Sequence, residues 1–167
     1  MRAEDQQPAP LADASGLRFA VVVARFNAFI TDSLRDAAVA ALGEAGAADV
    51  EVIAVPGAFE VPQAARAAAE SGRFDGIVCL GCLIRGETPH FDYIASAAAL
   101  GIMAAAGETG VPMAFGVLTT NTTEQAEARA GAGPDNKGRE AAGAAIEMAR
   151  LHRDLHRRSA PAPGFRA

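Results

Sequence analysis

The segment from Gly81 to Asp92 combines residues that could bind an anion and move a proton. Its sequence is GCLIRGETPHFD, in which Gly86 permits a tight turn and Thr88 supplies a hydroxyl before a predicted helix. The first N–H groups of a helix are unpaired and carry partial positive charge, so this turn, with Arg85 nearby, is typical of a phosphate-binding site. His90 follows at the mouth of the turn, and imidazole can act as a general base or acid near neutral pH. A helix-start histidine that only caps or packs is the alternative.

Three further groups of unusual residues follow or lie in predicted strands. ARFN ends at Asn27, VPGAFE ends at Glu60, and a fourth apolar run contains Phe115. In an open parallel sheet the carboxyl ends of the strands share one edge, and ligands bind outside it. We therefore expect these loops to converge with the 81–92 segment on a single site.

The side chains in these loops have candidate roles, each with an ordinary structural alternative. Phe26 and Phe59 lie in predicted loops, where they could stack on a planar ring or plug the end of the sheet. Glu60 could accept hydrogen bonds from a heterocycle or only favour a helix N-terminus. Phe115 is a core residue by position, although near a strand end it could also face a ligand.

Two cations late in the chain have no obvious carboxylate partner four residues away on one regular helix. Arg129 follows a short helix that Thr122 and Gln125 are expected to cap, and Lys137 lies in GPDNKGRE. Both could reach a phosphate, including one bound to a neighbouring subunit. A solvated surface charge is the commoner outcome for a single arginine or lysine.

The apolar pattern predicts the elements that position these residues. Apolar runs predict four strands, at 17–24, 50–55, 76–84 and 112–119. Helix-period stretches lie at 31–46, 60–72, 90–106, 122–129 and 137–157. Apolar strands without a polar–apolar alternation are buried on both faces. The repetition of strand and helix along the chain implies parallel crossovers. We predict a single α/β domain with a terminal arm and tail, a three-layer α/β/α sandwich on a four-stranded parallel sheet, flavodoxin-like in class: arm 1–15, domain 16–158, tail 159–167.

Composition limits the classes of partner. The chain has 167 residues, 50% of them hydrophobic, and a net charge of −5, which does not favour nucleic acid as a partner. No apolar run approaches the roughly 20 residues that cross a bilayer, and no apolar signal region begins the chain, so we expect a soluble cytoplasmic protein without a membrane partner. Cys79 and Cys82 form a C-x-x-C inside a predicted strand, where their side chains should point to opposite faces. We therefore predict neither a redox pair nor a metal site.

The motifs together resemble the 6,7-dimethyl-8-ribityllumazine synthase family of riboflavin biosynthesis. The matching segments are RFN (25–27), VPGAFEVP (55–62), LGCLIRGETPHFDYIA (80–95), FGVLTTNTTEQAEARAG (115–131), NKGREAA (136–142) and IEMA (146–149). The resemblance implies a transferase that condenses 5-amino-6-(D-ribitylamino)uracil with 3,4-dihydroxy-2-butanone 4-phosphate, the penultimate step of the pathway. It also implies that no metal or organic cofactor takes part.

The resemblance implies a role for each site residue. His90 occupies the proton-transfer position. Phe115 and Arg129 would come from an adjacent subunit. The phosphate-binding positions are Glu87, Thr88, Arg129 and Lys137. The pyrimidine-binding positions are Phe26, Ala58, Phe59, Glu60, Cys82, Leu83, Ile84 and Phe115.

The resemblance also bears on the assembly of the protein and on one residue, Glu87. Members of this family form pentamers, and some pack twelve pentamers into a hollow shell, so we expect a homopentamer and leave the shell open. Many members carry a small residue at the position of Glu87, and a carboxylate repels a phosphate, so we expect its side chain to turn outward. The alternatives to an enzyme are a flavin- or lumazine-binding protein without turnover and a shell-forming protein of the same fold.

Overall fold

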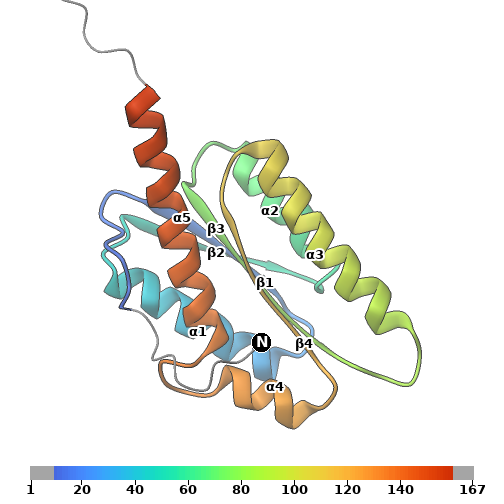
Figure 1. The fold of residues 1–167 in the computed structure, drawn as a ribbon. Coiled ribbons are helices and arrows are strands. Elements are labelled where there is room, and N and C mark those ends of the chain that lie inside the picture. The colour runs from blue at the N-terminus through green and yellow to red at the C-terminus, as the bar shows by residue number, and fades with distance from the viewer. Residues whose placement is uncertain (1–9, 160–167) are drawn as a thin grey trace, which may run out of the picture.

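Two layers of helices enclose a parallel sheet in the computed structural model, which describes the chain from residue 10 to residue 159 (Figure 1). The strands are β1 (Arg18–Ala24), β2 (Asp49–Val55), β3 (Gly76–Ile84) and β4 (Met113–Thr120), in the order β2-β1-β3-β4. The helices are α1 (Ala28–Glu44), α2 (Val61–Glu70), α3 (His90–Thr109), α4 (Thr123–Ala130) and α5 (Lys137–Ser159). The predicted fold class, a three-layer α/β/α sandwich of the flavodoxin-like type on four parallel strands, is confirmed.

Each face of the sheet carries its own apolar core. Val21 of β1 is buried with Leu34 and Ile146 on the side of α1 and α5. The next residue, Val22, is buried with Val61 on the side of α2 and α3. The central strands β1 and β3 are therefore covered on both faces, as their unbroken apolar runs predicted. The edge strands β2 and β4 each pair with one strand and are only partly buried.

Small residues let the helices approach the sheet and one another closely. A Cβ atom on Gly138 of α5 would lie 2.0 Å from the carbonyl oxygen of Leu34 on α1. A Cβ atom on Gly116 of β4 would lie 2.6 Å from Leu80 Cδ2. Both distances are far inside van der Waals contact, so the alanine- and glycine-rich composition is a packing requirement of this fold.

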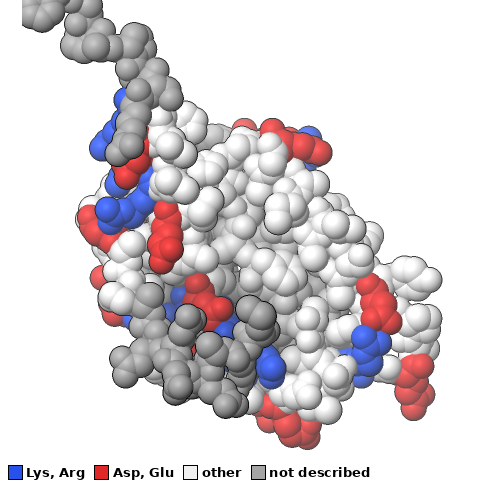
Figure 2. Space-filling view, viewed as in Figure 1, with Lys and Arg blue, Asp and Glu red and all other residues white. Residues whose placement is uncertain are grey.

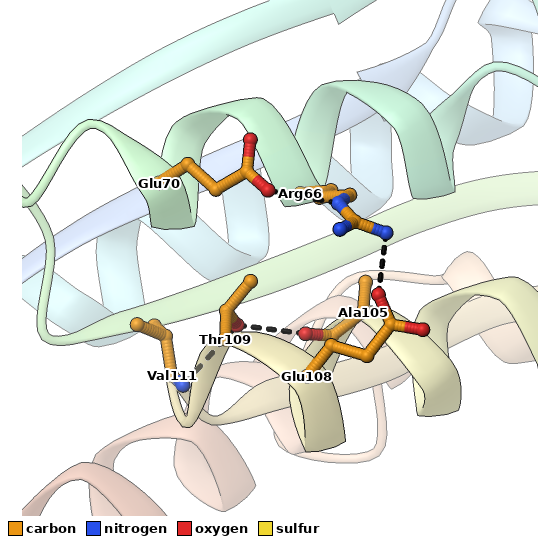
Figure 3. A network of polar contacts seen from close by, with 6 residues as sticks. All are labelled: Arg66, Glu70, Ala105, Glu108, Thr109 and Val111. Carbon is orange, nitrogen blue, oxygen red and sulfur yellow. Dashed lines mark hydrogen bonds and ion pairs between the residues drawn. The ribbon is translucent and has the colours of Figure 1, made fainter.

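A polar network joins the two helices of the second layer (Figure 3). Arg66 of α2 donates from Nε to Glu70 Oε1 at 2.8 Å and also pairs with Glu108 of α3. At the end of α3 the Thr109 hydroxyl donates to the carbonyl of Ala105 at 2.7 Å. The Arg66, Glu70 and Glu108 side chains are about half exposed, so their ion pairs add little stability.

Residues just before the predicted boundary at residue 16 already pack on the rest of the described chain. The Ala14 amide donates to the carbonyl of Ala45 at 2.8 Å, and the Ala14 side chain is fully buried. Ser15 pairs with Ala47 in an isolated antiparallel bridge. The last part of the predicted arm therefore packs on the domain, whereas residues 1–9 and 160–167 lie outside the described part of the chain.

Candidate functional site

The strand register brings the predicted loops to one edge of the sheet. Ala24 ends β1 opposite Val55, the last residue of β2. β3 runs on past this level through Cys82, Leu83 and Ile84. The loops after β1 and β2 therefore lie beside the projecting end of β3, as predicted, whereas Phe115 of the fourth strand does not lie at this edge.

Hydrogen bonds hold the loop after β1 against β2 and β3. The Phe26 amide donates to the carbonyl of Pro56 at 3.2 Å, and Asn27 Nδ2 donates to the carbonyl of Cys82 at 2.9 Å. Asn27 has a φ of 59°, the only positive φ outside glycine in the described residues. Asparagine tolerates this left-handed conformation, which turns the chain so that α1 begins at Ala28 instead of the predicted residue 31.

Two aromatic rings are exposed at this edge. Phe26 is 69% exposed and Phe59 is 50% exposed, so neither plugs the end of the sheet. Between the loops, Ala58 is buried and supplies a floor. Glu60 stands directly before the first residue of α2, and its amide donates to the carbonyl of Gly57 at 3.2 Å. The exposed rings favour the ligand-stacking role over the core role.

The end of β3 contributes backbone more than side chains. The Cys82 side chain is buried in the core beside α1 and α5, and its carbonyl accepts the bond from Asn27. Leu83 and Ile84 are partly exposed at the strand end. Burial raises the pKa of the Cys82 thiol to about 11 and that of Cys79 to about 12. Both thiols are therefore neutral near pH 7.

The two cysteines lie on opposite faces of the sheet, as predicted. Cys79 belongs to the core beside α2 and α3, and Cys82 to the other core. Both are free thiols. Between residues 10 and 159, no group of three histidine, cysteine, aspartate or glutamate side chains is close enough to hold a metal ion.

The turn between β3 and α3 is exposed from end to end. Glu87 and Thr88 have open side chains, and Pro89 occupies the position before the first residue of α3. His90 is that first residue and is also exposed. The Asp92 amide donates to the carbonyl of Pro89 at 3.0 Å, which leaves the amides before it, at the start of the helix, as the candidate donors for an anion. The outward orientation of Glu87 relative to a phosphate stays a prediction.

Arg85 is engaged within this turn. Its guanidinium donates two hydrogen bonds to Asp92, at 3.0 and 2.7 Å, and lies 4.3 Å from the centre of the Phe91 ring. Arg85 Nε also donates to Asn121 Oδ1 at 3.3 Å. The hydrogen bonds from Arg85 hold the pKa of Asp92 below its usual value. Asp92 thus has a structural role that its sequence position did not indicate.

Phe115, Arg129 and Lys137 form a second group, away from the turn. All three line a hollow of about 270 Å³ along the edge of β4, which pairs only with β3 among the described strands. The expectation that Phe115 is a core residue is wrong, because its side chain is 48% exposed. It also does not lie near the carboxyl end of its strand, because it pairs with Cys79 in the middle of β3. It precedes Thr120 by five positions, about 16 Å along an extended strand.

The two cations differ in their partners. Lys137 forms an ion pair with Glu140, three residues on, a spacing that the expectation of no partner four residues away did not cover. Arg129 donates to the carbonyl of Gln125 at 2.8 Å and, among residues 10–159, forms no ion pair. Arg129 therefore keeps most of its donors for another anion, and Lys137 would have to exchange its partner.

The match to a protein family covers both groups of residues. The model of the 6,7-dimethyl-8-ribityllumazine synthase family matches residues 16–153 of the 167-residue chain. The chain belongs to this family. As in the resemblance drawn from the motifs, the matched range includes His90 and its turn as well as Arg129 and Lys137.

The candidate site residues of this member of the lumazine synthase family fall into two groups. The first group consists of the loops after β1, β2 and β3, which meet at one edge of the sheet. The second group lies along the side of β4. Among the helices described, none combines the length and apolar character needed to span a bilayer.

Proposed function

We propose that the chain condenses 5-amino-6-(D-ribitylamino)uracil with 3,4-dihydroxy-2-butanone 4-phosphate to 6,7-dimethyl-8-ribityllumazine, with loss of phosphate and water. The observation that supports the proposal is that the loops carrying the exposed Phe26 and Phe59 rings lie at the same edge of the sheet as the end of β3, which leads into the turn before His90. Membership of the family supports the same step of riboflavin biosynthesis.

The first group of residues suits the pyrimidine. Phe26 and Phe59 offer exposed rings that can stack on a flat heterocycle. The Glu60 carboxylate can accept hydrogen bonds from ring N–H groups or from ribityl hydroxyls. The partly exposed end of β3 at Leu83 and Ile84 would form the wall beside it.

The phosphate would lie between the turn and a cation. Thr88 and the first N–H groups of α3 supply donors on one side. Arg129, whose guanidinium is in no ion pair within the described chain, would supply the charge, with Lys137 nearby. Donors on both sides stabilise phosphate as a leaving group.

His90 would carry protons between the steps of the condensation. The amine of the pyrimidine attacks the ketone and a first water leaves. Phosphate is then eliminated, and the second amine attacks the carbonyl that this elimination leaves and closes the ring with loss of a second water. Each step moves a proton, which an exposed imidazole can accept and return. Because both reactants are intrinsically reactive, holding them together supplies much of the effect, up to about 7–11 kcal/mol.

The distance between the two groups supports a site shared by neighbouring subunits. Phe115 lies about 16 Å along the strand from its carboxyl end, too far for one chain to place it beside His90. The exposed face of α3 is apolar, with Tyr93 72%, Leu100 68% and Met103 74% exposed. Figure 2 shows few charged side chains over β4 and the adjoining α3. We propose that copies of the chain bury these faces in a homopentamer.

A direct assay tests the proposed function. Purified protein mixed with both substrates should produce the absorbance of the lumazine faster than the spontaneous condensation. A rate equal to the spontaneous one, together with measurable binding of the lumazine, would instead indicate a binding protein without turnover. A cytoplasmic location stays a prediction.

A further inference from the structure

We propose that Arg85 and Asp92 form a positioning clamp that closes the phosphate-binding turn, and that Arg85 does not itself bind the substrate. The proposal rests on the proposed function, because it assigns the segment between these two residues to the substrate phosphate. It gives a role to a pair that the motif alone does not explain.

The clamp joins the two ends of the turn. Arg85 is the first residue after β3, and Asp92 lies in the first turn of α3. Two parallel hydrogen bonds of 3.0 and 2.7 Å connect them. A bidentate arginine–carboxylate pair fixes direction as well as distance. Thr88 and His90 lie inside the closed segment, so their backbone positions depend on this pair.

Two further contacts keep Arg85 in place. Its guanidinium lies over the Phe91 ring at 4.3 Å, which restricts rotation of the side chain. Its Nε donates to Asn121 Oδ1 at 3.3 Å, and its amide donates to the carbonyl of Thr120 at 2.9 Å. Arg85 thus connects three segments: the end of β3, the start of α3 and the loop after β4.

Electrostatics argue against Arg85 as a phosphate ligand. The paired carboxylate of Asp92 offsets its charge, and to turn toward a phosphate the side chain would have to leave Asp92, Phe91 and Asn121 together. Arg129 needs to give up only one bond to a backbone carbonyl. The positive charge for the phosphate therefore comes more easily from Arg129.

The chain contains a matched control at the other end of β3. Arg73 forms a bidentate pair with Glu51, at 2.7 and 3.2 Å, and lies 4.7 Å from the centre of the Phe74 ring. Its chemistry is the same as that of Arg85, but it precedes β3 and the turn follows β3. If Arg85→Ala weakens binding of the phosphorylated ketone and Arg73→Ala does not, the effect is therefore due to the turn.

Steady-state kinetics test the clamp. Arg85→Ala should raise the KM for the phosphorylated ketone by roughly tenfold through misplacement of the turn, with the KM for the pyrimidine unchanged. Arg73→Ala should leave both KM values unchanged. Equal effects of the two variants on the phosphorylated ketone would overturn the proposal.

The Asp92→Asn variant separates a clamp from a ligand. This substitution removes a negative charge near the phosphate and frees Arg85, so a ligand role predicts a lower or unchanged KM for the phosphorylated ketone. The clamp predicts a higher KM, and a double variant with Arg85→Ala no worse than Arg85→Ala alone. Arg85→Lys should restore little of the affinity for the phosphorylated ketone, because lysine cannot form the bidentate pair. Full rescue by lysine contradicts the clamp.

Amide hydrogen exchange tests the clamp without reference to turnover. In the unliganded protein, Arg85→Ala should speed exchange at Gly86, Glu87, Thr88 and His90, and Arg73→Ala should not. If the wild-type protein forms no lumazine while exchange behaves in this way, the proposed function fails and the clamp stands. Unchanged exchange in Arg85→Ala removes the clamp even in an active enzyme.

Discussion

His90 is the residue to which proton transfer is assigned, and its surroundings leave it free for that task. It begins α3, and its side chain is exposed beside the turn. We expect His90→Ala to lower kcat by roughly 10²-fold, the low end for general acid–base catalysis, because proximity of the reactants is retained. Both KM values should change little. Single-turnover and steady-state assays measure this, and an unchanged kcat removes His90 from the mechanism.

Cys82 has a protonation state that can be tested through stability. Burial raises its pKa from 9.0 to about 11. As pH rises, the unfolded chain therefore loses the thiol proton before the folded chain does. The contribution of the buried thiol to the free energy of unfolding is complete below pH 9 and is lost as pH rises toward 11. Measured by denaturant unfolding, the free energy of unfolding of the wild-type protein should fall more steeply over this pH range than that of Cys82→Ala. Parallel curves would show that the thiol is not buried in solution.

Single residues show where sequence reasoning was sufficient and where it was not. The exposure of Phe26 and Phe59 follows from their places in loops after strands. The position of Phe115 does not, because strand ends are the least certain part of an apolar run and its register with Cys79 depends on the whole sheet. The ion pair of Lys137 with Glu140 was missed although the start of α5 was predicted correctly, because only partners four residues away were considered and Glu140 lies three residues on.

Where the observed boundaries of helices and strands differ from the predicted ones, the difference has an identifiable cause. β3 was predicted at 76–84 and is found there, since a fully buried strand has a clear pattern. α1 begins earlier than predicted because Asn27 adopts a left-handed conformation, and α3 runs to Thr109, where Gly110 ends it with a φ of 70°. The predicted capping of α4 is confirmed, as the Gln125 amide donates to Thr122 Oγ1 at 3.2 Å.

The contact between α1 and α5 gives a prediction about stability at the scale of elements. Gly138→Ala would place a Cβ atom 2.0 Å from a backbone oxygen of α1. We expect a loss of at least about 3 kcal/mol in the free energy of unfolding, since backbone cannot move aside as a side chain can. Gly43→Ala, on α1 with nothing within 4 Å, should instead gain about 0.5–1 kcal/mol. Denaturant midpoints compare the two, and similar midpoints contradict the packing described.

The whole molecule leaves an apolar face open on α3, which is where we expect other copies to bind. Met103→Asp should convert the assembly to smaller species and lower turnover, although Met103 lies outside the site. Ala40→Asp adds the same charge to the exposed side of α1, across the sheet, and serves as the control. Light scattering with parallel assays tests this. An assembly that survives Met103→Asp indicates that another surface holds it together.

The central claim is that one site takes residues from two chains, and mixing two inactive variants tests it most directly. His90→Ala retains Arg129, and Arg129→Ala retains His90. If the two residues come from neighbouring chains, an equal mixture assembled together should regain about a quarter of wild-type activity, the expectation for random neighbours in a ring. If each site belongs to one chain, the mixture will show only the average of the two parent activities, and the shared site is contradicted.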